Sequence, residues 1–308
     1  MEVDPPWLES DTWYLCRETF WNARTGVIQQ QPPDGLRVDG HTRKRSAPRC
    51  GPWAVPFVCP PPRLDDRFSP PSLEPPKAYT QLEVHCVGDR RSPVFTAPHS
   101  INLARDGCKA HLPEDFTSFI AAALAVFTQG CSVTWGAAAQ LRSDELEAPF
   151  AGLRDPNYLT AEEERENEWV GALRRLRSES KCMLHVDVHG KRDREGEAAC
   201  DVGVGACRAH WGDRAAEALA AALHCSLKEA LPAYAVDPRP KLQGCWRSVP
   251  RRSLTQCATS LGYVAVQLEL SYSFRRDLAR DLKLLEAMAG ALTTCPHPCR
   301  DDVSERPC

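Results

Sequence analysis

From residue 79 onward the sequence alternates between short apolar runs and longer amphipathic runs, which limits the folds open to it. Runs such as CSVTWG and YVAVQLELSY have the length and the β-branched content of buried strands. Between the strand-like runs, apolar residues recur at helical spacing. Alternating strands and helices predict an α/β fold with a mostly parallel or mixed sheet. We predict helices over residues 113–130, 161–179, 213–231 and 274–292.

Proline is concentrated between residues 32 and 76, and it excludes helices and central strands there, because it lacks a backbone donor and fixes φ. We expect a Pro-rich linker in this region, partly in the polyproline II conformation. The expected division of the chain is a small module (1–36), the linker (37–78), a main domain (79–292) and a Cys-containing tail (293–308). The tail fits either a second zinc site or a frayed end with incidental thiols.

Charge and cysteine content argue against several classes of function. A formal net charge of −3 over 308 residues gives no basis for binding nucleic acid or an anionic membrane. No apolar run reaches the roughly 18 residues of a membrane span. The 15 cysteines are odd in number, and the N-terminus does not resemble a secretory signal. We therefore expect free thiols in a reducing compartment and a cytoplasmic protein.

The segment DPPWLESDTWYLCRETFWNARTGVIQQQPP resembles a WW domain. Trp7 follows the opening prolines, an N-x-x-T-G turn starts at Asn22, and Pro33 matches the closing proline. The resemblance implies a small three-stranded sheet in which Trp7 packs on Pro33. Gln30 stands where the family has its second Trp, so the module is degenerate, and a proline-rich peptide would lack its aromatic slot. The other interpretation is an aromatic-rich tail that packs on the main domain.

The stretch HVDVHG, residues 185–190, places three groups able to bind a metal on one strand. His185, Asp187 and His189 share one face, because side chains alternate along a strand. His189, near the strand end, is the natural ligand, whereas Asp187 would orient an imidazole and His185 would be structural. Zinc suits such nitrogen and oxygen donors. The alternative is a pair of core histidines with ordinary hydrogen-bond partners.

Glu269 stands inside an otherwise apolar strand, VAVQLELS. A buried carboxylate is costly unless it is paired or performs chemistry. The two interpretations are a functional carboxylate and a buried ion pair with Arg275.

Four short segments together resemble the N-formylglutamate amidohydrolase family, a branch of the zinc carboxypeptidase-like superfamily. They are, in order, PHS (98–100), DPNYL (155–159), HVDVHG (185–190) and VQLELS (266–271). The resemblance covers about residues 80–290. It implies a three-layer α/β/α fold and one Zn²⁺ per chain. It also implies hydrolysis of the amide bond of a small N-acyl amino acid, for example an N-formyl one.

Carried over residue by residue, the resemblance makes His99 and His189 zinc ligands and Glu269 the general base. The acidic ligand is open. An H-x-x-E motif starting at His99 would need a glutamate where Asn102 stands, whereas HLPE (111–114) offers Glu114, which we choose. Glu114 also fits a carboxylate that complements a helix dipole.

The resemblance makes Asn157 the residue that holds the substrate carboxylate. The family often has an arginine after it, but here Tyr158 follows. The arginines that would take its place are Arg154, Arg142 and Arg275.

The alternative function is a catalytically inactive protein with a hydrolase fold. It would recruit partners through its WW-like module and its Pro-rich segment. Bound zinc and an amidase rate that is lost in Glu269→Gln would distinguish the enzyme from this protein.

Overall fold

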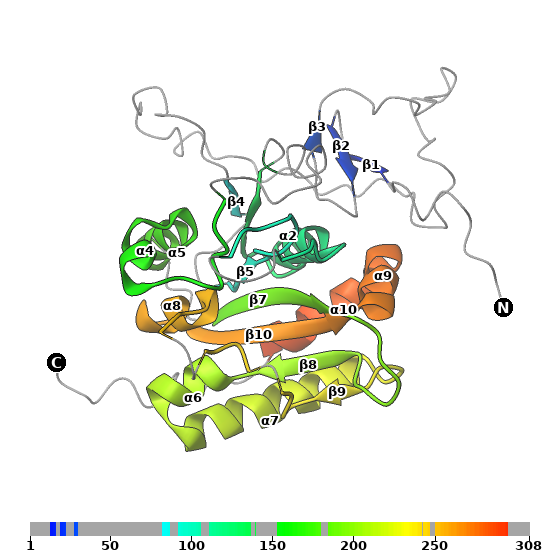
Figure 1. The fold of residues 1–308 in the computed structure, drawn as a ribbon. Coiled ribbons are helices and arrows are strands. Elements are labelled where there is room, and N and C mark those ends of the chain that lie inside the picture. The colour runs from blue at the N-terminus through cyan, green and yellow to red at the C-terminus, as the bar shows by residue number, and fades with distance from the viewer. Residues whose placement is uncertain are drawn as a thin grey trace.

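The structure is a computed structural model. It describes residues 13–16, 19–22, 28–29, 82–86, 92–105, 111–136, 139, 153–179, 184–241, 243–246 and 250–294, the first three ranges as strands only. These residues form a three-stranded sheet and a seven-stranded sheet (Figure 1).

The small sheet has the order β1-β2-β3 with antiparallel pairing. Its strands are β1 (Trp13–Cys16), β2 (Thr19–Asn22) and β3 (Ile28–Gln29). Three strands in this segment are what the expected N-terminal module requires. Its assignment as a WW domain stays a prediction, because Trp7, Pro33 and the linker (37–78) lie outside the described residues.

The large sheet has the order β4-β6-β5-β7-β10-β8-β9. Its strands are β4 (Leu82–Cys86), β5 (Val94–Thr96), β6 (Cys131–Trp135), β7 (Leu184–Lys191), β8 (Cys200–Gly203), β9 (Val236–Asp237) and β10 (Val264–Ser271). The central strands β6, β5, β7 and β10 are parallel, whereas β4 and β8 pair antiparallel with their inner neighbours. The predicted α/β class with a mixed sheet is confirmed.

Helices cover both faces of the large sheet, as the two apolar cores show (Figure 1). One core includes α2, α7, α9 and α10, and the other includes α5 and α8. The molecule therefore has the predicted three layers. The described helices are α2 (Thr117–Phe127), α4 (Ala161–Glu166), α5 (Glu168–Glu179), α6 (Gly205–Trp211), α7 (Asp213–Ala230), α8 (Leu254–Ser260), α9 (Tyr272–Arg280) and α10 (Leu282–Thr294).

Two predicted helices are each divided in two by a capping residue. The predicted helix over 161–179 breaks at Asn167, whose ψ of 128° is extended and whose Oδ1 accepts a bond from Trp169 N at 3.0 Å. The helix predicted over 274–292 breaks at Asp281, whose Oδ1 accepts from Lys283 N at 2.9 Å. Short polar side chains bond to backbone N–H groups in this way at helix starts, so they compete with a continuous helix.

The helix predicted from residue 113 begins only at Thr117, because Phe116 takes a left-handed conformation with φ 71°. Glu114 therefore precedes the helix, and no acidic residue lies in its first turn. After β8 the chain forms the short helix α6 (Gly205–Trp211), which the sequence did not predict. Gly205 allows its start, since a Cβ there would lie 2.7 Å from Gln243 and Cys245.

Among the described helices, none has the length and apolarity that a membrane crossing requires.

Candidate functional site

The parallel strands bring polar side chains together at one edge of the sheet. Thr96 of β5 is the ladder partner of Asp187 of β7, and His189 is the partner of Glu269 of β10. Because partners in a parallel ladder point to the same face, these side chains gather on one surface. His99 follows β5 at the same edge. The strand ends thus form a polar site of the kind expected in open α/β sheets.

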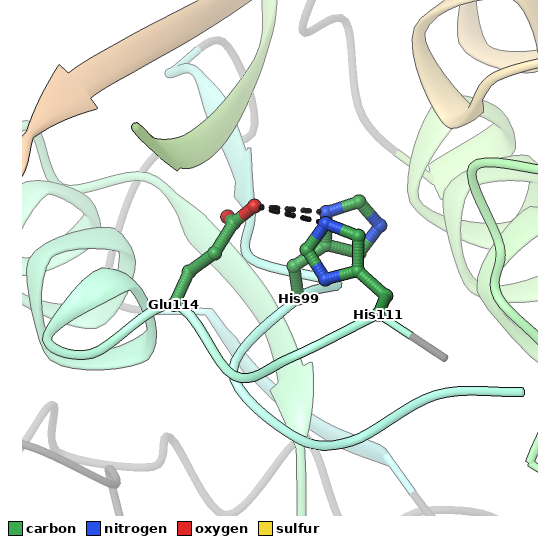
Figure 2. Close-up of side chains that lie close together, drawn as sticks. All are labelled: His99, His111 and Glu114. Atoms are coloured by element: carbon green, nitrogen blue, oxygen red, sulfur yellow. Dashed lines mark hydrogen bonds and ion pairs between the residues drawn. The ribbon is translucent and has the colours of Figure 1, made fainter. Parts of the chain in front are cut away.

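The carboxylate of Glu114 lies among three imidazoles. Its Oε1 is 3.1 Å from His99 Nδ1 and 3.4 Å from His111 Nε2, and its Oε2 is 3.4 Å from His189 Nδ1. Figure 2 shows the first two contacts, with the rings of His99 and His111 lying over one another. All four side chains are largely buried.

Backbone groups hold Glu114 in place. Its N–H donates to the carbonyl of His99 at 2.7 Å, and Gly190 N donates to its Oε2 at 2.7 Å. A Cβ at residue 190 would lie 2.4 Å from the guanidinium of Arg275, so that guanidinium would have to shift if another residue replaced the glycine. The glycine after HVDVH therefore lets an arginine approach and presents an N–H to Glu114; the strand itself continues to Lys191.

A buried aspartate fixes the orientation of His99. Asp155 Oδ1 lies 2.9 Å from His99 Nε2, so that ring nitrogen donates and Nδ1 turns towards Glu114. Asp155 also pairs with Arg105 Nε and accepts from Asn157 N at 2.8 Å. Burial alone would raise the pKa of Asp155, but the charge of His99 outweighs it and lowers the pKa, so the residue is a carboxylate.

Asp187 plays the matching part for His189. Its Oδ2 lies 3.0 Å from His189 Nε2, which leaves Nδ1 facing Glu114. The Thr96 hydroxyl donates to Asp187 Oδ1, so it must accept from His185 Nε2, 2.9 Å away. The sequence predicts an orienting carboxylate at Asp187, a role that stays a prediction; His185 is fully buried and makes its contact with Thr96.

Electrostatics show that the site attracts positive charge. Burial would lower the pKa of His99, but Asp155 and Glu114 outweigh it and raise the pKa to about 9. The pKa of His189 is likewise raised, against burial, by Asp187 and Glu114. Burial would raise the pKa of Glu114, but the neighbouring histidines lower it. Carboxylates that hold protons on two imidazoles would also hold a metal cation in their place.

His111, which sequence reasoning did not choose as a ligand, belongs to this cluster. The ligand atoms of His99, His111 and Glu114 lie within 4.8 Å of one another, an arrangement that could hold a metal ion. His111 stacks on His99, with ring centroids 3.8 Å apart. Burial and the charge of His99 lower its pKa to about 4, so the ring is neutral at pH 7. The H-x-x-E spacing to Glu114 was the available signal.

The donor set fits zinc. Imidazole nitrogens and a carboxylate oxygen are its usual ligands in catalytic sites, commonly three from the protein. Here His99 and His189 each present Nδ1 towards Glu114 while a buried aspartate holds the other ring nitrogen. Such carboxylate–histidine pairs accompany metal-bound histidines, whose tautomer they fix.

Glu269 lines the same cavity, with 5% of its surface exposed. Burial raises its pKa to about 7, against the opposing charge of His189. Gln267 Nε2 donates to its Oε1. No ion pair links it to Arg275 within the part of the chain that the structure describes, so the ion-pair interpretation is not supported.

The cavity has a volume of about 420 Å³ and a basic rim. Arg105, Lys191 and Arg194 pair with carboxylates, whereas Arg192 and Lys241 are exposed and have no ion-pair partner among the described residues. These two cations were not singled out from the sequence. Among the lining residues that the structure describes, Trp246 is the one aromatic residue other than histidine.

The residues predicted to bind substrate are not brought together. Asn157 lines the cavity, but its Oδ1 accepts from Leu254 N at 2.6 Å and its Nδ2 lies 2.9 Å from His189 Nε2. Arg154 is exposed and pairs with Glu163. Arg275 is buried against the carbonyl of Asp115 and does not line the cavity. Arg142 lies outside the described residues.

No protein-family model matches the chain, and a search of curated proteins found no match. Among solved structures, it is similar to a bacteriophage poly-gamma-glutamate hydrolase (14% identity, 71% of this chain and 91% of that chain, TM-score 0.38). The zinc-free form of YndL also matches (14%, 71% and 92%, TM-score 0.41), as does an N-acetylmuramoyl-L-alanine amidase from Clostridium difficile 630 (11%, 67% and 96%, TM-score 0.34). At such distances, function has to be inferred from the residues of the site.

Proposed function

We propose that this protein is a zinc-dependent amidohydrolase that cleaves the amide bond of a small N-acyl amino acid. The observation that supports this most strongly is the convergence of His99 Nδ1 and His189 Nδ1 on the two oxygens of Glu114, beside Glu269 in one cavity. These three residues would hold one Zn²⁺. The bound ion would supply Lewis-acid chemistry, which activates water and polarises an amide carbonyl.

Glu269 would act as the general base and acid. It lines the cavity next to His189, and the bond from Gln267 limits the rotation of its carboxylate. A pKa of about 7 suits a group that takes a proton from water and returns it to the leaving nitrogen near neutral pH.

The remaining residues would position these groups and the substrate. Asp155 and Asp187 hold the imidazoles in one tautomer, and Asn157 accepts from Leu254 N and donates to Asp187 Oδ2. The basic rim would attract the carboxylate of the substrate, for which Arg192 and Lys241 are placed. The earlier candidates Asn157, Arg154, Arg142 and Arg275 remain predictions for this role.

Metal content of the purified full-length chain tests the proposal first. Wild type should carry about one zinc per chain, the number of such sites proposed. His189→Ala should lose it, whereas His210→Ala, which removes an exposed histidine of α6, should keep it. A chain that binds no zinc even when zinc is supplied would refute the enzyme and leave the non-catalytic partner-recruiting protein.

Turnover tests the role of Glu269. Glu269→Gln should keep zinc and lower the rate on N-acyl amino acids by about 10²–10⁴-fold, the usual contribution of a general base. Glu286→Gln, an exposed change on α10, is the matched control and should leave the rate unchanged. Normal turnover in Glu269→Gln would show that another group moves the proton.

A further inference from the structure

Trp246 presents an indole to the cavity. It is 37% exposed and is the one aromatic residue other than histidine among the described residues that line this cavity. The other lining residues are mostly charged, polar or small. A large apolar ring exposed inside such a cavity offers a stacking surface that water covers poorly.

The indole is held in position by three hydrogen bonds around residue 246. Its Nε1 donates to the carbonyl of Asn157 at 2.6 Å. The Trp246 N–H donates to Gln256 Oε1 at 3.1 Å, and its carbonyl accepts from Gln256 Nε2 at 3.3 Å. A ring fixed before a ligand arrives loses little conformational entropy on binding, which favours an aromatic contact there.

Tyr158 supports the indole from the side. The two rings meet edge to face, with centroids 5.3 Å apart and planes at 74°. Arg251 lies over the Tyr158 ring at 4.8 Å and pairs with Glu163 at 3.1 Å. Tyr158, the residue found where the family pattern has an arginine, thus packs against the edge of the indole, although it does not itself line the cavity.

The same cavity contains cations that suit a carboxylate. Arg192 and Lys241 line it without an ion-pair partner in the described part of the chain. Asp193, between the two rim arginines, accepts bonds from Ser273 N at 3.0 Å and Ser273 Oγ at 2.6 Å. This ties the loop after β7, which carries Arg192, to the start of α9.

We propose that Trp246 is a stacking subsite and that the substrate is an N-acyl amino acid carrying an aromatic ring. The ring lies on Trp246 and the carboxylate lies at Arg192 and Lys241, with the amide between them near Glu269. This rests on the proposed function and names its substrate class. The ring belongs either to the acyl group or to the amino-acid side chain, and ligands of both kinds distinguish the two.

Calorimetric binding to zinc-loaded, full-length Glu269→Gln tests the subsite without turnover. The probes are N-benzoylglycine, N-acetylphenylalanine and N-acetylglycine. At least one aromatic probe should bind about 10-fold more tightly than N-acetylglycine, the scale of one aromatic contact. Adding Trp246→Ala should remove that preference and leave N-acetylglycine affinity within about 2-fold, because only the stacked ring loses its partner.

Two further variants test whether the preference depends on a stacking ring at residue 246. Trp246→Phe keeps a stacking ring and should keep most of the preference, even if the alanine variant misfolds. Trp211→Ala removes another exposed indole, one that does not line the cavity, and should change nothing. Equal affinity for all three probes in the parent, or an unchanged preference in Trp246→Ala, would overturn the subsite. Zinc content and turnover on N-acetylglycine judge the proposed function separately.

Discussion

His99 Nε2 donates a hydrogen bond to Asp155 Oδ1 across 2.9 Å, and this turns Nδ1 of the same ring towards Glu114. The pair Asp187 and His189 repeats the relationship at 3.0 Å. Two imidazoles, each held by a buried aspartate, therefore face one carboxylate from two neighbouring strand ends. Such repetition is what a preformed cation site requires, since the ligands need no reorganisation on binding.

Removal of either buried negative charge should weaken metal binding. Asp155→Asn and Asp187→Asn keep the shape of the side chain but lower the basicity of the imidazole that each one holds. We expect zinc affinity to fall by about 10–100-fold in each variant, measured by competition with a chelator. Asp213→Asn, on the exposed start of α7, is the control and should bind zinc normally. Unchanged affinity in both variants would mean that neither histidine is a ligand.

His111 and His189 should differ in their effect on the metal. His111 stacks on His99 with planes 29° apart, and His99 Nδ1 and His111 Nε2 both lie near Glu114 Oε1, at 3.1 and 3.4 Å. Nδ1 of His111 has no hydrogen-bond partner among the described residues, whereas His189 is held by Asp187. We expect His189→Ala to abolish stoichiometric zinc and His111→Ala to retain it. The reverse result would make His99, His111 and Glu114 the ligand set.

The layered fold could be predicted because the spacing of apolar residues along the sequence indicates which faces of the strands and helices are buried. The strands 94–96, 131–135, 184–191 and 264–271 are apolar runs too short for helices. Helix breaks were missed, because Asn167 and Asp281 interrupt patterns that stay amphipathic across them. In each case, the hydrogen bonds of one side chain to backbone N–H groups divide the predicted helix into two.

The site residues that lie at or just after the ends of strands could be predicted from the sequence. His99, His189 and Glu269 lie close together because three neighbouring parallel strands end at one edge. His111, Asp155 and Trp246 reach the same place from loops. Their position depends on pairings between distant segments, such as Leu103 with His111 and Ala104 with Arg154, which no local pattern encodes.

His185 should make folding stability depend on pH. Burial lowers its pKa from 6.5 to about 4, so the folded protein keeps it neutral. In the unfolded chain this histidine takes up a proton near pH 6.5. The contribution of His185 to the free energy of unfolding is therefore complete above pH 6.5 and declines as the pH falls towards 4. On lowering the pH from 7.5 to 5, this residue should reduce the free energy of unfolding by about 2 kcal/mol.

The measurement is urea unfolding at both pH values with a chelator present. His185→Gln retains a donor for Thr96 but does not titrate, so its free energy of unfolding should fall by about 2 kcal/mol less than that of wild type. His210→Gln should behave like wild type. Equal pH dependence in wild type and His185→Gln would show that the ring is not kept neutral.

Cys86 and Cys131 should form a disulfide on oxidation. They are directly opposite in the antiparallel β4–β6 ladder, and their sulfur atoms are 2.7 Å apart. Opposite Cα atoms in such ladders lie about 4.5–5.5 Å apart, within the range of disulfides.

Oxidised glutathione tests this pairing: the two cysteine thiols lose two protons and two electrons to form the disulfide, and the glutathione disulfide is reduced to two glutathione thiols. We expect a cross-linked peptide in a non-reducing mass-spectrometric map and a gain in stability of up to about 4 kcal/mol from the closed loop. Cys131→Ser should show neither; a wild-type map without that peptide would contradict the pairing.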